Sequence, residues 1–492
     1  MLFTEPTFLF LFLPVLLALY FVRRVHASYA NWLLLIASVI FYAKGGGAFT
    51  WLMLGSIAFN YWMAIAVDRA RGPADPRETP PERLRRARLL VGVAVGINLV
   101  VLGVFKYANF FADNVNAMFL ALGVHPLVVP RVLLPIGISF FTFHAISYVV
   151  DVYRRDAAAQ KSPVHAALYL LLFPQLIAGP IIRYREIAGQ LARRRVTLDD
   201  FAYGVQRFVI GLGKKVLIAN IVAGPADQIF ALPAAGLDAP RAWIGITCYT
   251  LQIYFDFSGY SDMAIGLGRM FGFRFPENFR WPYIADTVQE FWRRWHISLS
   301  SWFRDYLYVP LGGNRVSPGA VYRNLVIVFF LCGLWHGASW NFVVWGLFHG
   351  SFLVMERVGL AGAVKRLWPP LRHVYLMLVV MVGWVFFRAE TLTAAIDFLK
   401  AMAGLTVPAP SPYTLAWYLP FDVRLALLAG IVGSAPIVPA LAGWRARLEQ
   451  RAERARATLV DAVAAAALLA VFGIAILHVA ARSYNPFIYF RF

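Results

Sequence analysis

The sequence predicts an all-α protein that crosses a membrane many times. Hydrophobic residues make up 60% of the 492 residues and charged residues only 15%, whereas about a quarter of the residues of an ordinary soluble domain are charged. The mean hydropathy is correspondingly high, at +0.63. Long apolar stretches recur from one end of the chain to the other, and a helix of about 20 apolar residues is long enough to cross the hydrocarbon core of a membrane.

The apolar stretches determine how many helices we expect. They lie near residues 7–22, 30–43, 48–67, 89–106, 132–152, 165–182, 203–222, 241–270, 323–359, 373–388, 421–442 and 457–480. Several are short or are interrupted by proline and glycine. We therefore expect roughly eleven transmembrane helices, with re-entrant and interfacial helices between them.

The distribution of charge also fits a membrane protein. The formal net charge is +20, and the Lys and Arg residues cluster in short loops at 23–24, 69–88, 183–195 and 445–456. Cytoplasmic loops of membrane proteins carry such an excess of basic residues, so we place these loops on the cytoplasmic side. Nucleic-acid binding is not expected, because no soluble basic domain carries the charge.

One continuous membrane domain over residues 1–492 is expected, since we find no sustained repeat and no low-complexity tract. Ionisable and polar groups interrupt the apolar helices from about residue 134 to 350. Such groups are costly inside a membrane and commonly face a cavity, so we place the catalytic core in 134–350 and the C-terminal helices and tail in 373–492. Cys248 and Cys332 lie in apolar runs, and no metal site is predicted.

The first candidate for catalysis is His336, in the segment LCGLWHGASWNFVVWGLFHG at residues 331–350, which we expect to be a long apolar helix. A neutral imidazole can accept a proton from a hydroxyl near neutral pH, and Gly333 and Gly337 would leave room for a substrate beside the ring. A purely structural histidine is the alternative. His349 follows 13 residues later, about 220° around an unbroken helix, so a metal held by both rings is not expected.

The second candidate segment is EFWRRWHISLSSWFRDYLYVPLGGNR, residues 290–315, which combines charged side chains with aromatic rings. Arg293, Arg294 and His296 are its candidates for lining or orienting a substrate site. This composition suits an interfacial or re-entrant helix. A helix on the membrane surface without a catalytic function is the alternative.

Two carboxylates, Asp256 and Asp262, lie in the apolar segment YFDFSGYSDMAIGLGRMFGFRFPENF, residues 254–279. They could line a polar channel, bind a cation, or pair with arginines of residues 290–315. Pairing is favoured, because an isolated buried carboxylate is costly. Their spacing of six residues places them about 120° apart on an ideal helix, so a dyad that shares one proton is not favoured.

Several motifs, in the same order, resemble those of the membrane-bound O-acyltransferase family. They are LPIGISFFTF, FPQLIAGPI, YFDFSGYSDMAIG, PENFRWPY, EFWRRWHISLSSWFRDYLYVPLGG and LWHGASWNF, and they cover nearly the whole chain. Within the family, the sequence resembles the bacterial branch that contains the membrane subunit of alginate O-acetyltransferase and the protein for D-alanyl transfer to teichoic acid. The resemblance implies helices around a central tunnel and an O-acyltransferase of the bacterial inner membrane that crosses it many times.

The resemblance also implies roles for single residues. His336, in WHG, matches the characteristic histidine of the family, and His296 matches the second histidine of this branch. As a base, His336 would activate the attacking hydroxyl, while the thioester carbonyl needs a hydrogen-bond donor. His296, Trp335 and Asn341 are candidates for that donor or for orienting the base. The acyl donor would be acetyl-CoA or the thioester of a carrier protein, arriving from the cytoplasm, and no permanently bound cofactor is expected.

The chain ends in NPFIYFRF, residues 485–492, which resembles the C-terminal FxYxxF pattern of this branch. Tyr489 is therefore a candidate relay that takes the acyl group at its phenol and presents it to an extracytoplasmic partner. An aromatic anchor at the membrane interface is the alternative.

The resemblance implies O-acetylation of an extracellular, alginate-like polysaccharide, completed by a periplasmic partner similar to the SGNH hydrolases. D-alanyl transfer from a carrier protein to teichoic acid is the first alternative. A membrane transporter is the second, since broken helices and buried charges also build transport sites. A transporter would favour an internal repeat of the hydropathy pattern, which the sequence does not show. The sequence also has no P-loop, GxSxG or HExxH motif, which argues against ATP hydrolysis and against serine or zinc hydrolase chemistry.

Overall fold

The computed structural model describes residues 1–22, 27–72, 80–407, 413–450 and 454–481, and all regular secondary structure in this part of the chain is helical. The all-α prediction is confirmed. The described residues form two compact units, one drawn from Met1–Gly204 and Ala264–Pro276 and the other from Val205–Met263 and Glu277–Phe492. Two helices, α9 (Leu198–Gly213) and α11 (Ala239–Met270), contribute residues to both units. The single catalytic domain expected from the sequence stays a prediction.

The remaining helices belong to one unit each. The first unit contains η1 (Phe8–Phe12), α1 (Leu13–Val22), α2 (Ala27–Gly46), α3 (Phe49–Arg71), α4 (Pro81–Ala121), α5 (Ile138–Arg154), α6 (Pro163–Leu171), α7 (Phe173–Leu176) and α8 (Tyr184–Ala192). The second contains η3 (Lys214–Ala219), α10 (Asn220–Phe230), η4 (Ala234–Gly236), η5 (Pro282–Ile284), α12 (Val288–Arg294), α13 (Ile297–Phe303), η6 (Arg304–Tyr308), α14 (Pro318–His336), α15 (Trp340–Met355), η7 (Glu356–Leu360), α16 (Ala361–Arg366), α17 (Pro369–Arg388), α18 (Leu392–Met402), α19 (Leu415–Tyr418), α20 (Phe421–Gly433), α21 (Ile437–Gln450) and α22 (Arg454–Ala481).

Among the described residues, seven helices are long and apolar enough to cross a membrane. They are Phe49–Arg71, Pro81–Ala121, Leu198–Phe230, Pro318–His336, Trp340–Arg366, Pro369–Arg388 and Thr458–Ala481. The pair Phe421–Gly433 and Ile437–Leu448, bent by 58°, would raise the number to eight if it forms one broken span. The expected number of roughly eleven is not confirmed, because other apolar stretches form short helices such as the 17-residue α5 or carry buried charges, as α11 does.

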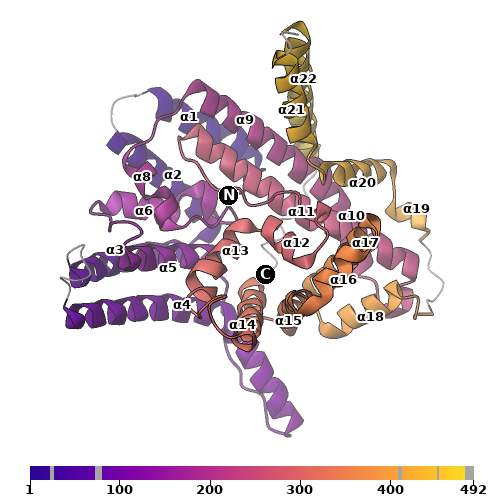
Figure 1. The fold of residues 1–492 in the computed structure, drawn as a ribbon, viewed down its shortest axis with the longest axis horizontal. Helices are drawn as coiled ribbons and strands as arrows, with labels where there is room; N and C mark the ends of the chain where they lie inside the picture. The colour runs from indigo at the N-terminus through magenta and orange to yellow at the C-terminus, as the bar shows by residue number, and fades with distance from the viewer. Residues whose placement is uncertain (23–26, 73–79, 408–412, 451–453, 482–492) are drawn as a thin grey trace. The chain divides into compact units, whose positions relative to one another are not determined.

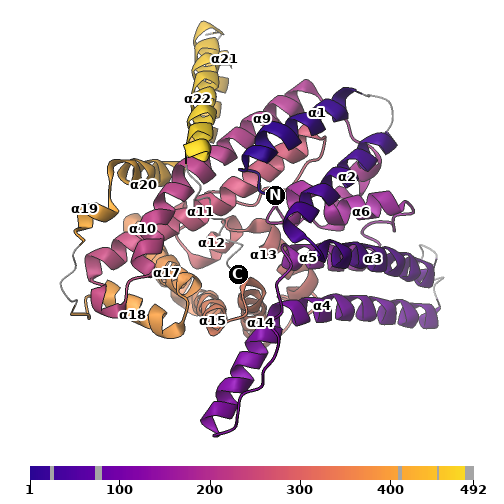
Figure 2. The same cartoon turned by 180° about the vertical axis from the view of Figure 1, so that it is seen from behind.

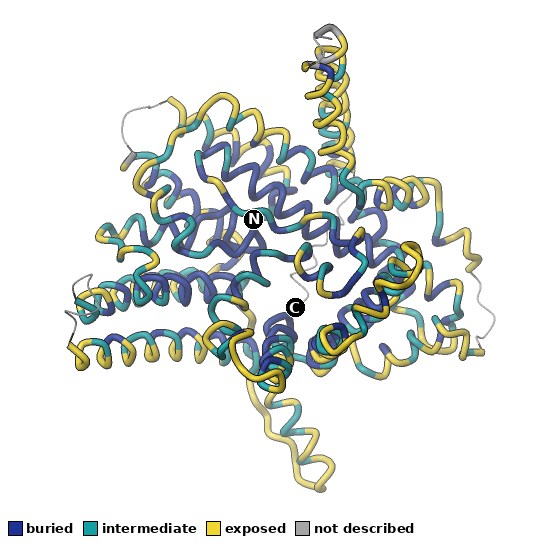
Figure 3. Tube along the Cα trace, in the orientation of Figure 1, coloured by how far each residue is buried: buried dark blue, intermediate teal, exposed yellow. Residues whose placement is uncertain are grey.

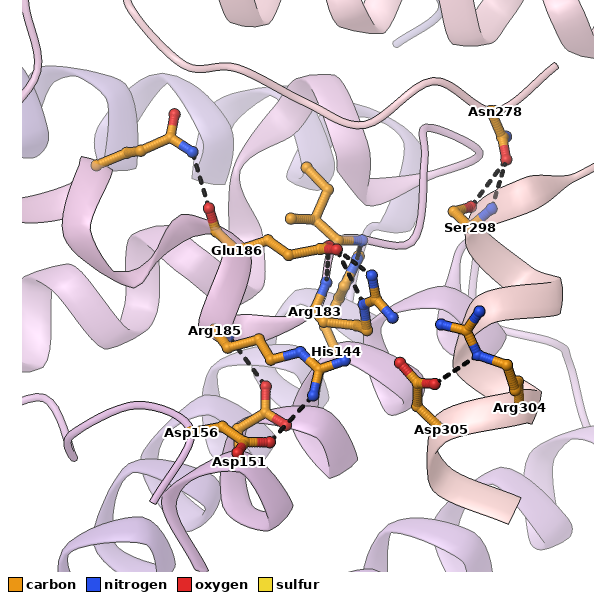
Figure 4. A network of polar contacts seen from close by, with 12 residues as sticks. His144, Asp151, Asp156, Arg183, Arg185, Glu186, Asn278, Ser298, Arg304 and Asp305 are labelled. Atoms are coloured by element: carbon orange, nitrogen blue, oxygen red, sulfur yellow. Dashed lines mark hydrogen bonds and ion pairs between the residues drawn. The ribbon is translucent and has the colours of Figure 1, made fainter. Parts of the chain in front are cut away.

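The first unit contains a bundle in which α3, α4 and α5 lie side by side (Figures 1 and 2). Asn60 on α3 and Asn98 on α4 are buried, and their side chains exchange hydrogen bonds of 3.1 and 2.8 Å. Elsewhere in this unit, Arg185 donates to Asp156 over 3.0 Å, and its backbone nitrogen donates to Asp151 over the same distance (Figure 4). The two buried asparagines thus satisfy each other's side-chain amides.

The second unit is built around α14, α15 and α17, which pack against one another in order (Figures 1 and 2). Both α14 and α17 begin with proline in the first turn, where the missing N–H costs nothing because the first turn has no helical acceptor. Unlike these packed helices, α22 is mostly exposed, because only 6% of its most apolar stretch is buried (Figure 3). Its exposed aliphatic side chains suit contact with lipid.

Candidate active site

His336 is the last residue of α14, and the helix ends there because Gly337 adopts an extended conformation with φ −164° and ψ 152°. The next helix, α15, begins at Trp340. The single unbroken helix expected for residues 331–350 is therefore wrong, and the chain makes a helical hairpin at this point. His336 lies at the bend of that hairpin.

The hairpin is tight because glycines face backbone in the opposite helix. A Cβ atom added at Gly333 would collide with the carbonyl oxygen of Phe342, and one added at Gly346 would collide with that of Phe329. A Cβ atom at Gly337 would collide with the ring of Phe342. The space that Gly333 and Gly337 were expected to leave for a substrate is thus filled by Phe342, and these glycines serve helix packing.

The imidazole of His336 is buried among aromatic rings. Trp335, Trp345 and Phe387 have ring centroids 5.0, 5.0 and 5.2 Å from it, at interplanar angles of 80°, 83° and 72°. Such edge-to-face contacts restrict the orientation of the ring. The surroundings therefore hold His336 in one direction and keep bulk water away from it.

His296 lies between the short helices α12 and α13, with its side chain fully buried. Its backbone is in the left-handed region, with φ 43° and ψ 54°, a conformation that costs free energy for residues other than glycine and tends to occur at functional sites. The ring meets Phe257 edge to face, with centroids 4.6 Å apart. Burial lowers the pKa of His296 to about 3, so the imidazole is neutral at physiological pH.

Trp335 links these two histidines within the second unit. Its ring centroid lies 6.2 Å from that of His296 and 5.0 Å from that of His336. Side chains separated by 40 residues in the chain thus belong to one aromatic cluster. The structure brings together three of the residues that the sequence singled out.

Asn278 is a residue of this site that sequence reasoning missed. Its Oδ1 atom lies 3.1 Å from Nδ1 of His296. The same atom accepts hydrogen bonds from the backbone nitrogen and hydroxyl of Ser298 over 3.2 and 2.9 Å (Figure 4). Its Nδ2 atom donates to the hydroxyl of Ser261 over 2.9 Å. Asn278 stands in the motif PENF, at the end of the segment 254–279, and nothing in that pattern singles out its amide.

Other residues named from the sequence have partners of their own. Asn341 donates to the carbonyl of Ala389, just beyond the end of α17, over 2.5 Å. Arg294 donates to Glu290 over 2.9 Å, and Arg293 is exposed. An orienting function of these three side chains toward a substrate stays a prediction.

The two carboxylates on α11 are paired with separate cations. Asp262 accepts from Arg207 over 2.8 Å and from Lys214 over 2.7 Å, and Asp256 lies 2.5 Å from the ammonium of Lys215. Pairing was expected, but the partners found for these carboxylates come from residues 207–215 and not from the arginines of 290–315. The close approach of Gly211 to Gly259 brings the two helical segments together.

Two expectations concern metal and relay chemistry. Within the described ranges, no group of three or more His, Cys, Asp or Glu side chains is arranged to hold a metal ion. Tyr489, the candidate acyl relay, lies outside the described residues.

Comparison with known proteins gives consistent matches. A model of the membrane-bound O-acyltransferase family matches residues 119–391. The chain is 44% identical to a protein of Azotobacter vinelandii named "probable alginate O-acetylase", over the full length of both. It is 37% identical to a peptidoglycan O-acetyltransferase of Helicobacter pylori, over 82% of this chain and 80% of that protein. A teichoic acid D-alanyltransferase of Bacillus subtilis is 31% identical over only 44% of this chain and 58% of its own.

Proposed function

Because this chain belongs to the membrane-bound O-acyltransferase family, we propose that it moves acetyl groups from a cytoplasmic acyl thioester toward an extracellular polysaccharide of the alginate type. His336 and His296 are the proposed catalytic residues. The observation that carries this assignment is the aromatic cluster in which Trp335 contacts both imidazoles. A positioned imidazole can act as the general base for acyl transfer to a hydroxyl.

The proposed reaction moves the acyl group from the sulfur atom of the thioester to the oxygen atom of a hydroxyl. One imidazole of the pair His336 and His296 accepts the proton of the attacking hydroxyl as its oxygen forms a bond to the carbonyl carbon of the thioester. The carbon–sulfur bond breaks, and the leaving thiolate takes the proton back from the imidazole. The basic loop at 183–195 would attract the phosphates of acetyl-CoA, although the thioester of a carrier protein would serve the same chemistry.

The similarity to other proteins supports acetyl as the transferred group. Both the full-length relative from Azotobacter vinelandii and the relative from Helicobacter pylori are named for O-acetyl transfer to a saccharide polymer. The similarity to a D-alanyltransferase covers less than half of the chain, so D-alanyl transfer ranks second. We further propose that the protein lies in the bacterial inner membrane and that a periplasmic SGNH-hydrolase-like partner completes the transfer to the polymer, with Tyr489 as the acyl relay.

The test is the acetyl ester content of the secreted polysaccharide in cells whose only copy carries His336→Ala. We expect the ester to disappear while the amount of protein in the membrane stays normal. His125→Ala, at an exposed loop residue of the first unit, is the matched control and should leave the ester unchanged. Unchanged ester in His336→Ala cells would show that this chain does not acetylate that polymer through His336.

A further inference from the structure

We infer that Asn278 fixes the tautomer of His296, so that Nε2 of this histidine acts as a proton acceptor and not as a hydrogen-bond donor to the acyl oxygen. The inference rests on the proposed function for the role of His296 in catalysis. Its structural part, the position of the proton on the neutral imidazole, rests on the contacts of Asn278 and on the full burial of His296. These contacts are all made within the second unit.

The orientation of the Asn278 amide follows from a partner that can only donate. The backbone nitrogen of Ser298 donates to one end of the amide over 3.2 Å, and a backbone N–H has no acceptor function. That end is therefore the carbonyl oxygen, Oδ1. The amide nitrogen then faces the hydroxyl of Ser261 at 2.9 Å, which can accept. Asn278 and its two serine partners are all buried, so water does not compete for these positions.

The tautomer of His296 follows from the orientation of that amide. Nδ1 of His296 lies 3.1 Å from Oδ1 of Asn278, and a carbonyl oxygen can only accept. Nδ1 must therefore carry the proton of the neutral imidazole, which leaves the lone pair on Nε2. Within the described part of the chain, Nε2 of His296 has no hydrogen-bond partner, so this lone pair is available to a substrate hydroxyl.

Asn278 also holds the backbone that presents the ring. The backbone carbonyl oxygen of Asn278 accepts from the backbone nitrogen of Ile297 over 2.9 Å. The side-chain Oδ1 of Asn278 contacts both His296 and Ser298. Three consecutive residues are thus bound by one asparagine at the point where the chain enters its left-handed conformation. A residue in this position determines both the direction and the protonation of the ring.

The tautomer decides between two roles that the sequence left open for His296, which are to donate a hydrogen bond to the acyl oxygen or to accept a proton. A neutral imidazole with its proton on Nδ1 cannot donate from Nε2 to the developing oxyanion. It can take a proton from a hydroxyl at Nε2, after which the imidazolium keeps its Nδ1–H bond to Asn278. The neutral amide stabilises this ion without accepting its proton, so the proton returns from Nε2 to the leaving thiolate.

The activity test uses Asn278→Asp and Asn278→Leu. An aspartate keeps an acceptor for His296 and Ser298 but adds a negative charge, which favours the imidazolium. We expect Asn278→Asp to retain acyl transfer while the acid limb of its pH–rate profile moves to higher pH, and Asn278→Leu to lose roughly 10- to 100-fold in rate. Asn114→Asp on α4 is the control for effects of added charge on the assay. An unshifted pH–rate profile in Asn278→Asp would mean that Asn278 only supports the fold, and it would overturn the inference.

A second measurement does not depend on activity. Solid-state NMR of protein labelled with ¹⁵N at histidine distinguishes protonated from unprotonated ring nitrogens, and the signals of His296 are those missing from His296→Asn. We expect protonated Nδ1 and unprotonated Nε2 in the unmodified protein, and a mixture of tautomers in Asn278→Leu. A proton on Nε2 in the unmodified protein would refute the assignment. If the tautomer is as expected while His336→Ala still acetylates polymer, the proposed function fails and the role of Asn278 stands.

Discussion

The carboxylate of Glu356 lies 2.7 Å from the backbone nitrogen of Val288, 68 residues earlier in the chain. It also accepts from the backbone nitrogen of Gln289 over 2.9 Å and from the hydroxyl of Tyr375 over 3.1 Å. These two nitrogens open α12, where helical N–H groups have no acceptor of their own, and a negative charge is favourable at this end of a helix. Glu356 thus anchors the short helix that leads to His296.

The first prediction concerns this anchor. Glu356→Gln keeps the shape of the side chain but replaces an acceptor oxygen by an amide nitrogen, so one buried N–H of α12 loses its partner. We expect a loss of about 1–3 kcal/mol in stability, measured as a lower apparent melting temperature of the detergent-solubilised protein. Glu390→Gln, at an exposed residue, should melt like the unmodified protein. Equal melting temperatures for both variants would show that the Glu356 charge does not stabilise α12.

The second prediction concerns the α14–α15 hairpin. A methyl group at Gly333 collides with backbone of α15, which cannot move without separating the two helices. We expect Gly333→Ala to cost about 1–3 kcal/mol or more and to reduce the amount of folded protein in the membrane. Gly319→Ala, on the same helix with open space around its Cβ position, is the matched control. Similar amounts of both variants, measured by fluorescence-detected size-exclusion chromatography, would contradict the packing.

The sequence predicted the class of fold because composition and apolar length decide it. The apolar pattern of residues 331–350 continues past His336 and does not mark the end of α14. The break depends on Gly337 and on the tertiary packing of Phe342 against it. As a result, His336 and His349, which an unbroken helix would place on different faces, both contact Trp345, with centroids 5.0 and 5.2 Å away.

The sequence also could not show which residues pair with the buried polar side chains. The six-residue spacing of Asp256 and Asp262 argued against a shared proton, and the structure pairs Asp262 with Lys214 and Asp256 with Lys215. Which helix supplied those cations depended on helix packing at Gly211, and pattern alone does not specify packing partners. For the same reason, His336 and His296 could be named from a resemblance, whereas Asn278 could be found only from contacts.

The third prediction concerns the buried ion pair of Lys215 and Asp256, whose side chains are 5% and 2% exposed. Lys215→Met or Asp256→Leu alone takes this partner away from a buried charge, and we expect each to cost about 3–5 kcal/mol. The double variant should recover much of this loss, because no charge remains to be desolvated. Apparent melting temperatures of the four proteins give the coupling. Additive losses in the double variant would mean that the two groups do not depend on each other.

An exposed ion pair is the control for that experiment. Lys400 and Asp397 lie 3.3 Å apart, with the lysine side chain 54% exposed. Exposed pairs contribute little, because water and salt screen the charges. Lys400→Met should therefore leave the melting temperature nearly unchanged. A loss as large as that of Lys215→Met would show that burial is not what makes the Lys215 pair important.

The last prediction separates the fold of the His296 turn from its chemistry. Asparagine tolerates the left-handed backbone found at His296 better than most residues, and its Nδ2 can donate to Asn278 Oδ1 where Nδ1 of the imidazole does. It has no atom in the place of Nε2. We therefore expect His296→Asn to reach the membrane in normal amounts but to lose acetyl transfer.

His296→Val is the matched variant for the fold. A β-branched side chain is disfavoured at φ 43°, by about 1–2 kcal/mol, and valine cannot donate to Asn278. We expect this variant to lose both stability and activity, so that the amount of membrane protein and the acetyl ester content fall together. The decisive measurement is the ester content per amount of protein in His296→Asn. Full acetylation by this variant would show that Nε2 takes no part in the reaction, and His336 would then have to act without it.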